Sequence, residues 1–146
     1  MMRIPPAALG LGLAGVVPFV WGAVTQVWPG VGAASGLMPM FLGTYVALTY
    51  GMVILSFMSG VLWGFAARAD GPRATFGYAV SVIPALWAFF MVNADPAGAV
   101  VNLAAGFVAL LGLDAMFLRW GLAPPWWMRL RVILTVAVLA CLAVVA

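Results

Sequence analysis

Five long stretches of apolar residues, separated by short polar segments, dominate the chain. They lie at approximately residues 7–27, 39–67, 75–92, 97–118 and 125–146. A helix of about 20 mainly apolar residues crosses roughly 30 Å of hydrocarbon, so each stretch is long enough to span a bilayer. Apolar residues occupy every side of these stretches instead of alternating with polar ones, which argues against barrel strands. The pattern predicts an all-α polytopic membrane protein, a five-helix transmembrane bundle that forms a single domain over residues 1–146.

The segments between the stretches contain residues that end and start helices. Segment 68–73 combines glycine, proline and charged residues, and segment 119–125 places a glycine and then two prolines between two helices. Asp95 followed by Pro96 is typical of a helix start, with an N-cap residue and then a proline in the first turn. Segment 28–38 is glycine-rich and uncharged. Two interpretations stay open for it, a short interfacial helix and a partly buried loop.

Composition supports the membrane assignment and adds an orientation. Hydrophobic residues make up 67% of the chain and charged residues 6%, with a mean hydropathy of +1.22, which is far outside the range of soluble domains. With five spans, the six basic residues all fall on one side of the membrane: Arg3, Arg68, Arg73, Arg119, Arg129 and Arg131. Because such a bias marks the cytoplasmic face, we expect the N-terminus inside and the C-terminus outside, in a bacterial inner membrane or its organellar equivalent. Tryptophans are interleaved with these arginines, so we expect interfacial anchoring and no nucleic-acid partner.

The side chains required by most membrane enzymes and cofactor sites are missing. The sequence has no histidine, and its six basic residues are all arginine. Imidazole ligation of haem or copper, a Ser-His-Asp relay and a Schiff-base lysine are therefore excluded. Asp70, Asp95 and Asp114 are spread over two loops and one span, which argues against a metal cluster or a paired acid and base. We expect a protein that is not an enzyme and that holds no cofactor, metal or catalytic residue.

Asp114 and Asn102 are candidate functional residues within the spans. An ionisable side chain inside a span is costly and usually faces protein or water. For Asp114 we favour an ion pair that ties the fourth span to the fifth over a proton or substrate site, with three candidate partners: Arg119, Arg129 and Arg131. Asn102 shares a small and polar stripe with Gly98, Gly106 and Asp114, at multiples of four residues. We expect this helix face to be buried.

Ser56, Gly60 and Gly64 are spaced four residues apart in the second span. Lipid tails are as apolar as most helix surfaces, so helices associate in membranes through close approach at small residues and through interhelical hydrogen bonds. We interpret this row as a helix-packing or partner seam rather than as one wall of a ligand site. Gly60→Leu is then expected to disrupt folding or assembly.

Pro18 and Pro84 each interrupt a span near its middle. Each proline removes a hydrogen bond within its helix and favours a kink. Paired broken helices are a weak indication of a transporter, and five spans do not divide into two equal repeats. We favour kinking for packing.

Several motifs resemble those of a known family. Tyr50-Gly-Met-Val-Ile-Leu-Ser-Phe-Met-Ser-Gly-Val-Leu-Trp-Gly64 is similar to the signature of a family of small multi-pass membrane proteins of unknown function, which includes the mitochondrial transmembrane protein 69. Ser81-Val-Ile-Pro84, Asp114, and Pro125-Trp-Trp-Met-Arg-Leu-Arg131 with Thr135 are similar to later motifs of that family. The resemblance covers nearly the whole chain. It implies a five-span protein of bacterial inner membranes or mitochondria, and it brings no activity, substrate or cofactor.

Two functions are consistent with these observations. We favour a non-enzymatic accessory or assembly partner of a larger membrane complex, in contact with the lipid bilayer and with other membrane-protein subunits or a second copy of the chain. The alternative is a small carrier or channel for a small apolar or weakly polar molecule, using the interior around Asn102, Asp114 and Pro84. A polar cavity at mid-membrane would favour the carrier. A closed interior with a small-residue groove facing lipid would favour the accessory role.

Overall fold

The fold is a bundle of membrane-spanning helices. The computed structural model describes residues 3–93 and 97–146, and within these residues it contains helices and no strands. Five helices are long and apolar enough to cross a membrane, which confirms the expected all-α, five-span bundle. The first span consists of α1 (Pro6–Ala14) and α2 (Val17–Val27), and the second is α4 (Gly43–Ala66). The third consists of α5 (Gly71–Ser81), α6 (Ile83–Trp87) and the π-helical turn η2 (Ala88–Val92), and the last two are α7 (Ala99–Arg119) and α8 (Trp127–Val145).

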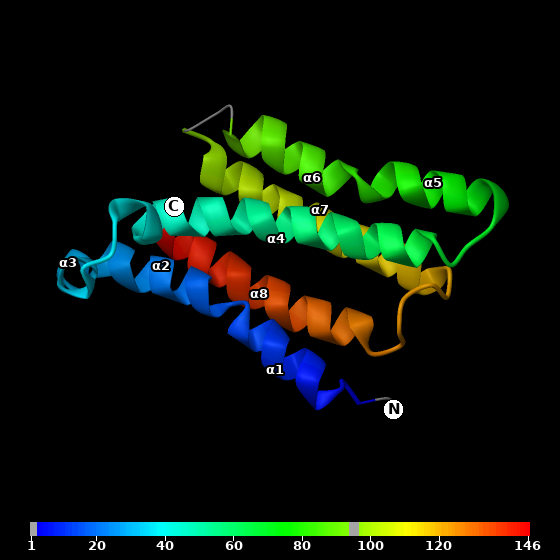
Figure 1. Cartoon of the computed structure of the whole chain (residues 1–146), viewed down its shortest axis with the longest axis horizontal. Coiled ribbons are helices and arrows are strands. Elements are labelled where there is room, and N and C mark those ends of the chain that lie inside the picture. The colour runs from blue at the N-terminus through cyan, green and yellow to red at the C-terminus, as the bar shows by residue number, and fades with distance from the viewer. Residues whose placement is uncertain (1–2, 94–96) are drawn as a thin grey trace.

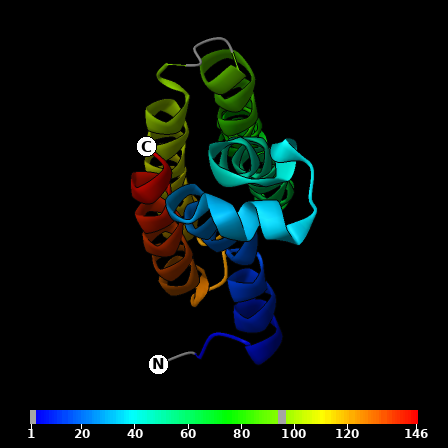
Figure 2. The ribbon, with the colours of Figure 1, turned by 90° about the vertical axis from the view of Figure 1, so that its left-hand side faces the viewer.

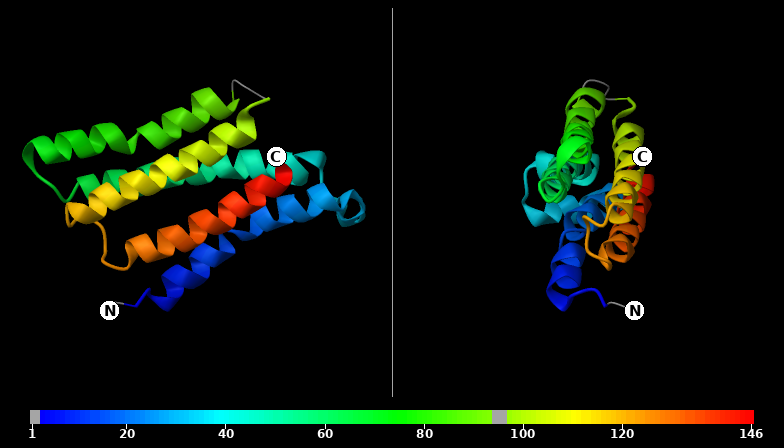
Figure 3. Two further views of the ribbon diagram at one scale, coloured as in Figure 1. Left: turned by 180° about the vertical axis from the view of Figure 1, so that it is seen from behind. Right: turned by 90° about the vertical axis from the view of Figure 1, so that its right-hand side faces the viewer.

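Helix α4 lies at the centre of the bundle, where it packs against α2, α5, α6 and α7 (Figures 1 and 3). Large apolar side chains fill the space between α4 and α7, namely Leu55, Leu62, Leu103, Phe107, Leu110 and Phe117, all fully buried or nearly so. The two on α4 are seven residues apart and those on α7 recur at spacings of four, three and seven, which places each set on one face of its helix. The core of the molecule therefore lies between the second and fourth spans.

The two ends of the bundle differ in charge. The N-terminal end of the described chain, the loop between α4 and α5 and the loop between α7 and α8 lie at one end, whereas α3 and the C-terminus lie at the other (Figure 1). Arg3, Arg68, Arg73, Arg119 and Arg129 lie within or next to these segments along the chain, so they are gathered at the first end. Which end faces the cytoplasm stays a prediction from this arginine bias.

The connection between the first and second spans is compact. Segment 28–38 contains the short helix α3 (Pro29–Ser35), followed by the 3₁₀ turn η1 (Pro39–Phe41), at the end of the bundle that faces the viewer in Figure 2. Helix α4 begins at Gly43, later than the expected residue 39, because the chain turns at Gly43 with φ of 55°, a conformation that glycine adopts readily. The Gly43 N–H donates a hydrogen bond to Thr25 Oγ1 at 2.7 Å, which ties the end of the first span to the start of the second.

Pro18 explains the break in the first span. Because Pro18 has no N–H, the carbonyl of Ala14 loses its partner within the helix; α1 ends at that residue and α2 begins three residues later. Helix α2 packs closely against α4 and α8. Helix α1 diverges from α4 and contains no buried residue (Figure 1). The break therefore separates α1 from α4 at the arginine-rich end.

Pro84 interrupts the third span in a different way. The N–H of Ala85, next to the proline, donates to Ser59 Oγ on α4 at 2.9 Å, so a cross-helix bond takes the place of one within the span. The π-helical turn follows this break. The expected helix start at Asp95 and Pro96 lies outside the described residues.

Candidate functional site

A buried ion pair joins the fourth and fifth spans. Asp114 on α7 is fully buried, with 0% of its surface exposed. Its Oδ2 accepts a hydrogen bond from Nε of Arg131 at 2.8 Å, and its Oδ1 accepts one from the indole Nε1 of Trp127 at 2.8 Å. Both carboxylate oxygens are therefore paired, as a buried charge requires. The pair ties α7 to α8 in the manner we favoured for Asp114.

The helix geometry selects Arg131 from the three candidate arginines. Trp127 and Arg131 are four residues apart on α8 and so lie on the same face, which packs on α7. Arg129 lies two residues from each of them and points away; it is exposed. Arg119 follows Asp114 by five residues on the same helix, about 140° around its axis, and is also exposed. Within the described residues, Asp114 with Arg131 is the one ion pair.

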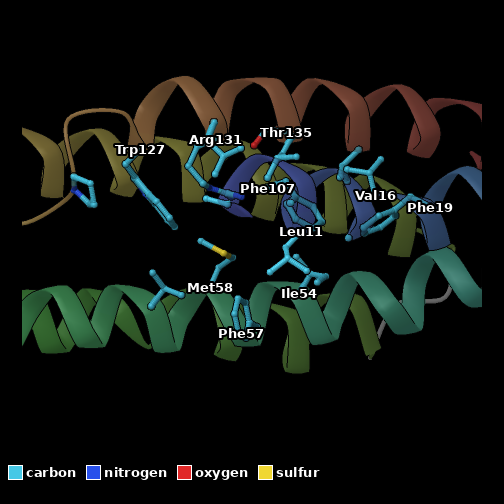
Figure 4. A pocket seen from close by; sticks show the side chains of 18 of the residues that line it. Leu11, Val16, Phe19, Ile54, Phe57, Met58, Phe107, Trp127, Arg131 and Thr135 are labelled. Carbon is cyan, nitrogen blue, oxygen red and sulfur yellow. The ribbon is translucent and has the colours of Figure 1, made fainter. Parts of the chain in front are cut away.

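An apolar pocket lies beside this ion pair, between the first span, α4 and α8. Its volume is about 430 Å³, and its walls are almost entirely apolar, with side chains that include Leu11, Val16, Phe19, Ile54, Phe57, Met58, Val61 and Leu134 (Figure 4). Leu11 and Phe57, on opposite walls, are 75% and 65% exposed. Both belong to helices that are long and apolar enough to cross a membrane, so these exposed side chains place the open side of the pocket on the lateral, lipid-facing surface of the bundle. The divergence of α1 from α4 makes room for it.

Two polar atoms in the pocket wall have no hydrogen-bond partner. Arg131 and Thr135, both on α8, line the pocket (Figure 4), and the two residues are 4% and 2% exposed. Within the described part of the chain, Nη2 of Arg131 and Oγ1 of Thr135 bond to nothing. The hydroxyl of Ser56, by contrast, donates to the carbonyl of Met52, one turn earlier, at 2.9 Å, the usual arrangement for a hydroxyl in a helix.

The other intramembrane candidate, Asn102, lies away from the pocket. Its side-chain amide donates to the carbonyl of Met91 at 2.9 Å, and its own carbonyl accepts from Nε1 of Trp87 at 2.7 Å. Gly106, one turn further on, lets Trp87 approach, because a Cβ there would meet the indole Cδ1 at 2.9 Å. Asn102 therefore provides a hydrogen-bond donor for a backbone carbonyl of the π-helical turn, where the helical hydrogen-bond pattern is altered.

The row of Ser56, Gly60 and Gly64 is not a packing seam within this chain. All three residues are exposed, and a Cβ added at Gly60 or Gly64 would meet no atom within 4 Å. The face of α4 that packs inside the bundle carries another set, Gly51, Leu55, Ser59, Leu62 and Ala66. Since this helix has small residues on two faces, the spacing alone did not distinguish them. Whether the outward row contacts a partner stays a prediction.

Groups able to hold a metal ion are scarce around the site. Within residues 3–93 and 97–146, no cluster of three or more cysteine or acidic side chains is present.

The arrangement of the pocket and of Arg131 and Thr135 suits an apolar molecule that carries a hydrogen-bond acceptor.

Comparison with known proteins places the chain in a family. A model described as protein of unknown function (DUF3429) matches residues 4–146. The chain belongs to the DUF3429 family. Transmembrane protein 69 of Xenopus tropicalis is 32% identical to it over 142 residues, which cover 90% of this chain and 50% of that protein. The chain thus spans about half the length of this curated relative, and no solved structure matches it. The expected resemblance is confirmed.

Sequence reasoning for this DUF3429 protein missed the pocket and Thr135's place in it. Thr135 follows Arg131 by four residues, as Arg131 follows Trp127, so the three side chains share one face of α8. This spacing was the available signal. The pocket itself depends on how far α1 diverges at Pro18, which no local pattern specifies.

Proposed function

We propose that this DUF3429 protein binds a small apolar or weakly polar molecule within the membrane, as a carrier or holding protein. The observation that carries the proposal is the pocket between α1, α4 and α8. Its volume of about 430 Å³ falls in the range of roughly 300–1,000 Å³ that small-molecule sites occupy. The pocket is not the polar cavity that we expected of a carrier; it has apolar walls with a few polar groups, which is the usual composition of a site for a small apolar molecule.

Lateral entry suits the position of the pocket. The opening between Leu11 and Phe57 faces the surroundings of the spans, so a molecule dissolved in the bilayer reaches it without crossing water. Transfer from lipid to an apolar pocket gains little from the hydrophobic effect, because both environments are apolar. Selective binding must therefore come from close packing and from the polar groups of the wall.

The proposal is a non-enzymatic one. The described residues that line the pocket include no carboxylate, thiol or amide side chain. Asp114, behind the wall, is held by Trp127 and Arg131, so it is not available as a base. We place the protein in a bacterial inner membrane with the arginine-rich end inside, in line with the charge bias.

Photolabelling tests the proposed binding. The full chain in lipid nanodiscs is exposed to an alkane that carries a diazirine, and the adducts are mapped by mass spectrometry. We expect saturable labelling of Leu11, Phe57 and Met58. Val61→Trp, which fills the pocket, lowers it several-fold, whereas Val108→Trp, at an exposed position of α7 outside the pocket, leaves it unchanged. Labelling spread evenly over the lipid-facing surface, without saturation, would contradict the proposal.

An accessory role in a membrane complex is the second candidate. Its specific support is the outward row of Ser56, Gly60 and Gly64, where another helix can approach the backbone of α4 closely. In-cell cross-linking of the native membrane, followed by mass spectrometry of co-purifying proteins, tests it. A stoichiometric complex supports this role, and recovery of the chain alone counts against it.

A further inference from the structure

The two unpartnered atoms of the pocket wall specify the chemistry of the molecule that binds. Nη2 of Arg131 and Oγ1 of Thr135 are buried without a partner, and a buried polar group left unpaired costs about 1–3 kcal/mol. Because the two residues are four apart on α8, they lie on one face and both line the pocket. Each of the two atoms has less than 1 Å² exposed, so a ligand reaches them only when a neighbouring side chain of the wall moves. From the geometry we infer that the ligand is a neutral lipophile with a carbonyl group, whose oxygen accepts hydrogen bonds from both. The inference rests on the binding function proposed above.

The charge balance of the site favours a neutral acceptor. The guanidinium of Arg131 already lies 2.8 Å from the carboxylate of Asp114, so the pair carries no net charge. A fatty carboxylate would bring an uncompensated negative charge into an apolar pocket, at a large desolvation cost. A neutral acceptor forms the hydrogen bonds without that cost.

The available donors favour a carbonyl over other neutral groups. Arg131 can only donate, and the hydroxyl of Thr135 can donate as well. A carbonyl oxygen has two lone pairs and accepts both bonds at once, and it brings no hydrogen that needs an acceptor of its own. Met58 extends from α4 into the same space (Figure 4). Its flexible side chain can move to let the oxygen reach α8.

Matched probes test the inference. Three diazirine lipophiles of equal length are used on the full chain in nanodiscs: an alkane, a ketone and a carboxylate. We expect the ketone to saturate the pocket at about tenfold lower concentration than the alkane, the effect of a hydrogen bond to a charged donor. The carboxylate is expected to bind more weakly than the ketone. A carboxylate that binds more tightly would overturn the inference.

Two variants separate the contribution of the polar contacts to binding from the contribution of the apolar walls. Thr135→Val keeps the volume and removes the hydroxyl, and Arg131→Lys keeps a positive charge beside Asp114 but removes the second planar nitrogen. Both should lower the preference for the ketone over the alkane several-fold, and the ratio of ketone to alkane labelling within each variant is the measured quantity. If ketone and alkane bind equally, and Val61→Trp blocks both, the pocket function stands and the carbonyl inference fails. If neither probe labels saturably, the proposed function itself fails.

The molecules that co-purify with the protein show which compound carries the carbonyl group. Molecules extracted from the purified wild-type chain, and depleted in Val61→Trp, are identified by mass spectrometry. A glycerolipid would identify the ester carbonyl of a membrane lipid as the ligand group, and a free lipophilic ketone or similar compound would identify a separate ligand. A retained molecule that has no carbonyl group would overturn the inference.

Discussion

At the scale of single residues, Asp114 fixes how α7 and α8, the last two spans, pack against each other. Its two oxygens are held by one side chain each, from Trp127 and Arg131 on α8. The sequence was sufficient to predict that an acid inside a span needs a cation, because the cost of an unpaired charge there is general. It was not sufficient to choose Arg131, because that choice depends on which face of α8 turns towards α7.

Asp114→Asn should lower the stability of the protein in detergent or nanodiscs. Removal of one member of a buried ion pair leaves the other uncompensated and typically costs about 3–5 kcal/mol. Asp70→Asn, at an exposed loop position, is the matched control and should leave the unfolding temperature unchanged. Thermal unfolding followed by intrinsic tryptophan fluorescence measures both. Equal unfolding temperatures for Asp114→Asn and the wild type would show that the pair contributes nothing.

At the scale of elements, two faces of α4 have different roles. The inner face carries Gly51, where a Cβ would collide with Leu103, and the outer face carries Gly60, where it would meet nothing within 4 Å. We expect Gly51→Leu to destabilise the chain and Gly60→Leu to leave its unfolding temperature unchanged. Any loss of a co-purifying membrane complex in Gly60→Leu then reports a partner contact. A destabilised Gly60→Leu variant would mean that the outer face packs within the chain after all.

The bend in the first span is the element that makes the pocket. Pro18→Ala restores an N–H for the carbonyl of Ala14 and favours a straight helix, so α1 should move relative to α4 and alkane labelling should fall several-fold. Pro6→Ala is the control, since a proline at the first position of α1 breaks no helical bond. Spin labels at Leu11 and Phe57, in a Cys141→Ala background, measure the distance across the opening. An unchanged distance distribution in Pro18→Ala would disprove this origin of the pocket.

At the scale of the whole molecule, the sequence predicted the architecture but not the pocket. Hydropathy locates the five spans because each must supply its own backbone hydrogen bonds and an apolar surface in lipid, a requirement that is local to each segment. The start of α4 at Gly43 differs from the prediction because it depends on a contact with Thr25 in another span. The pocket likewise depends on three spans at once, so no single stretch of sequence contains it.

The orientation of the molecule follows from its charge asymmetry and has a direct test. With the arginines gathered at one end, that end should stay in the cytoplasm, because arginine is retained there during insertion. Single cysteines are introduced in a Cys141→Ala background at two exposed positions, Asp70→Cys at the arginine-rich end and Ser35→Cys at the end of α3. In bacterial spheroplasts, a membrane-impermeant maleimide should label Ser35→Cys before lysis and Asp70→Cys only after it. The reverse pattern would place the N-terminus outside, and the lateral opening between Leu11 and Phe57 would then lie nearer the outer leaflet.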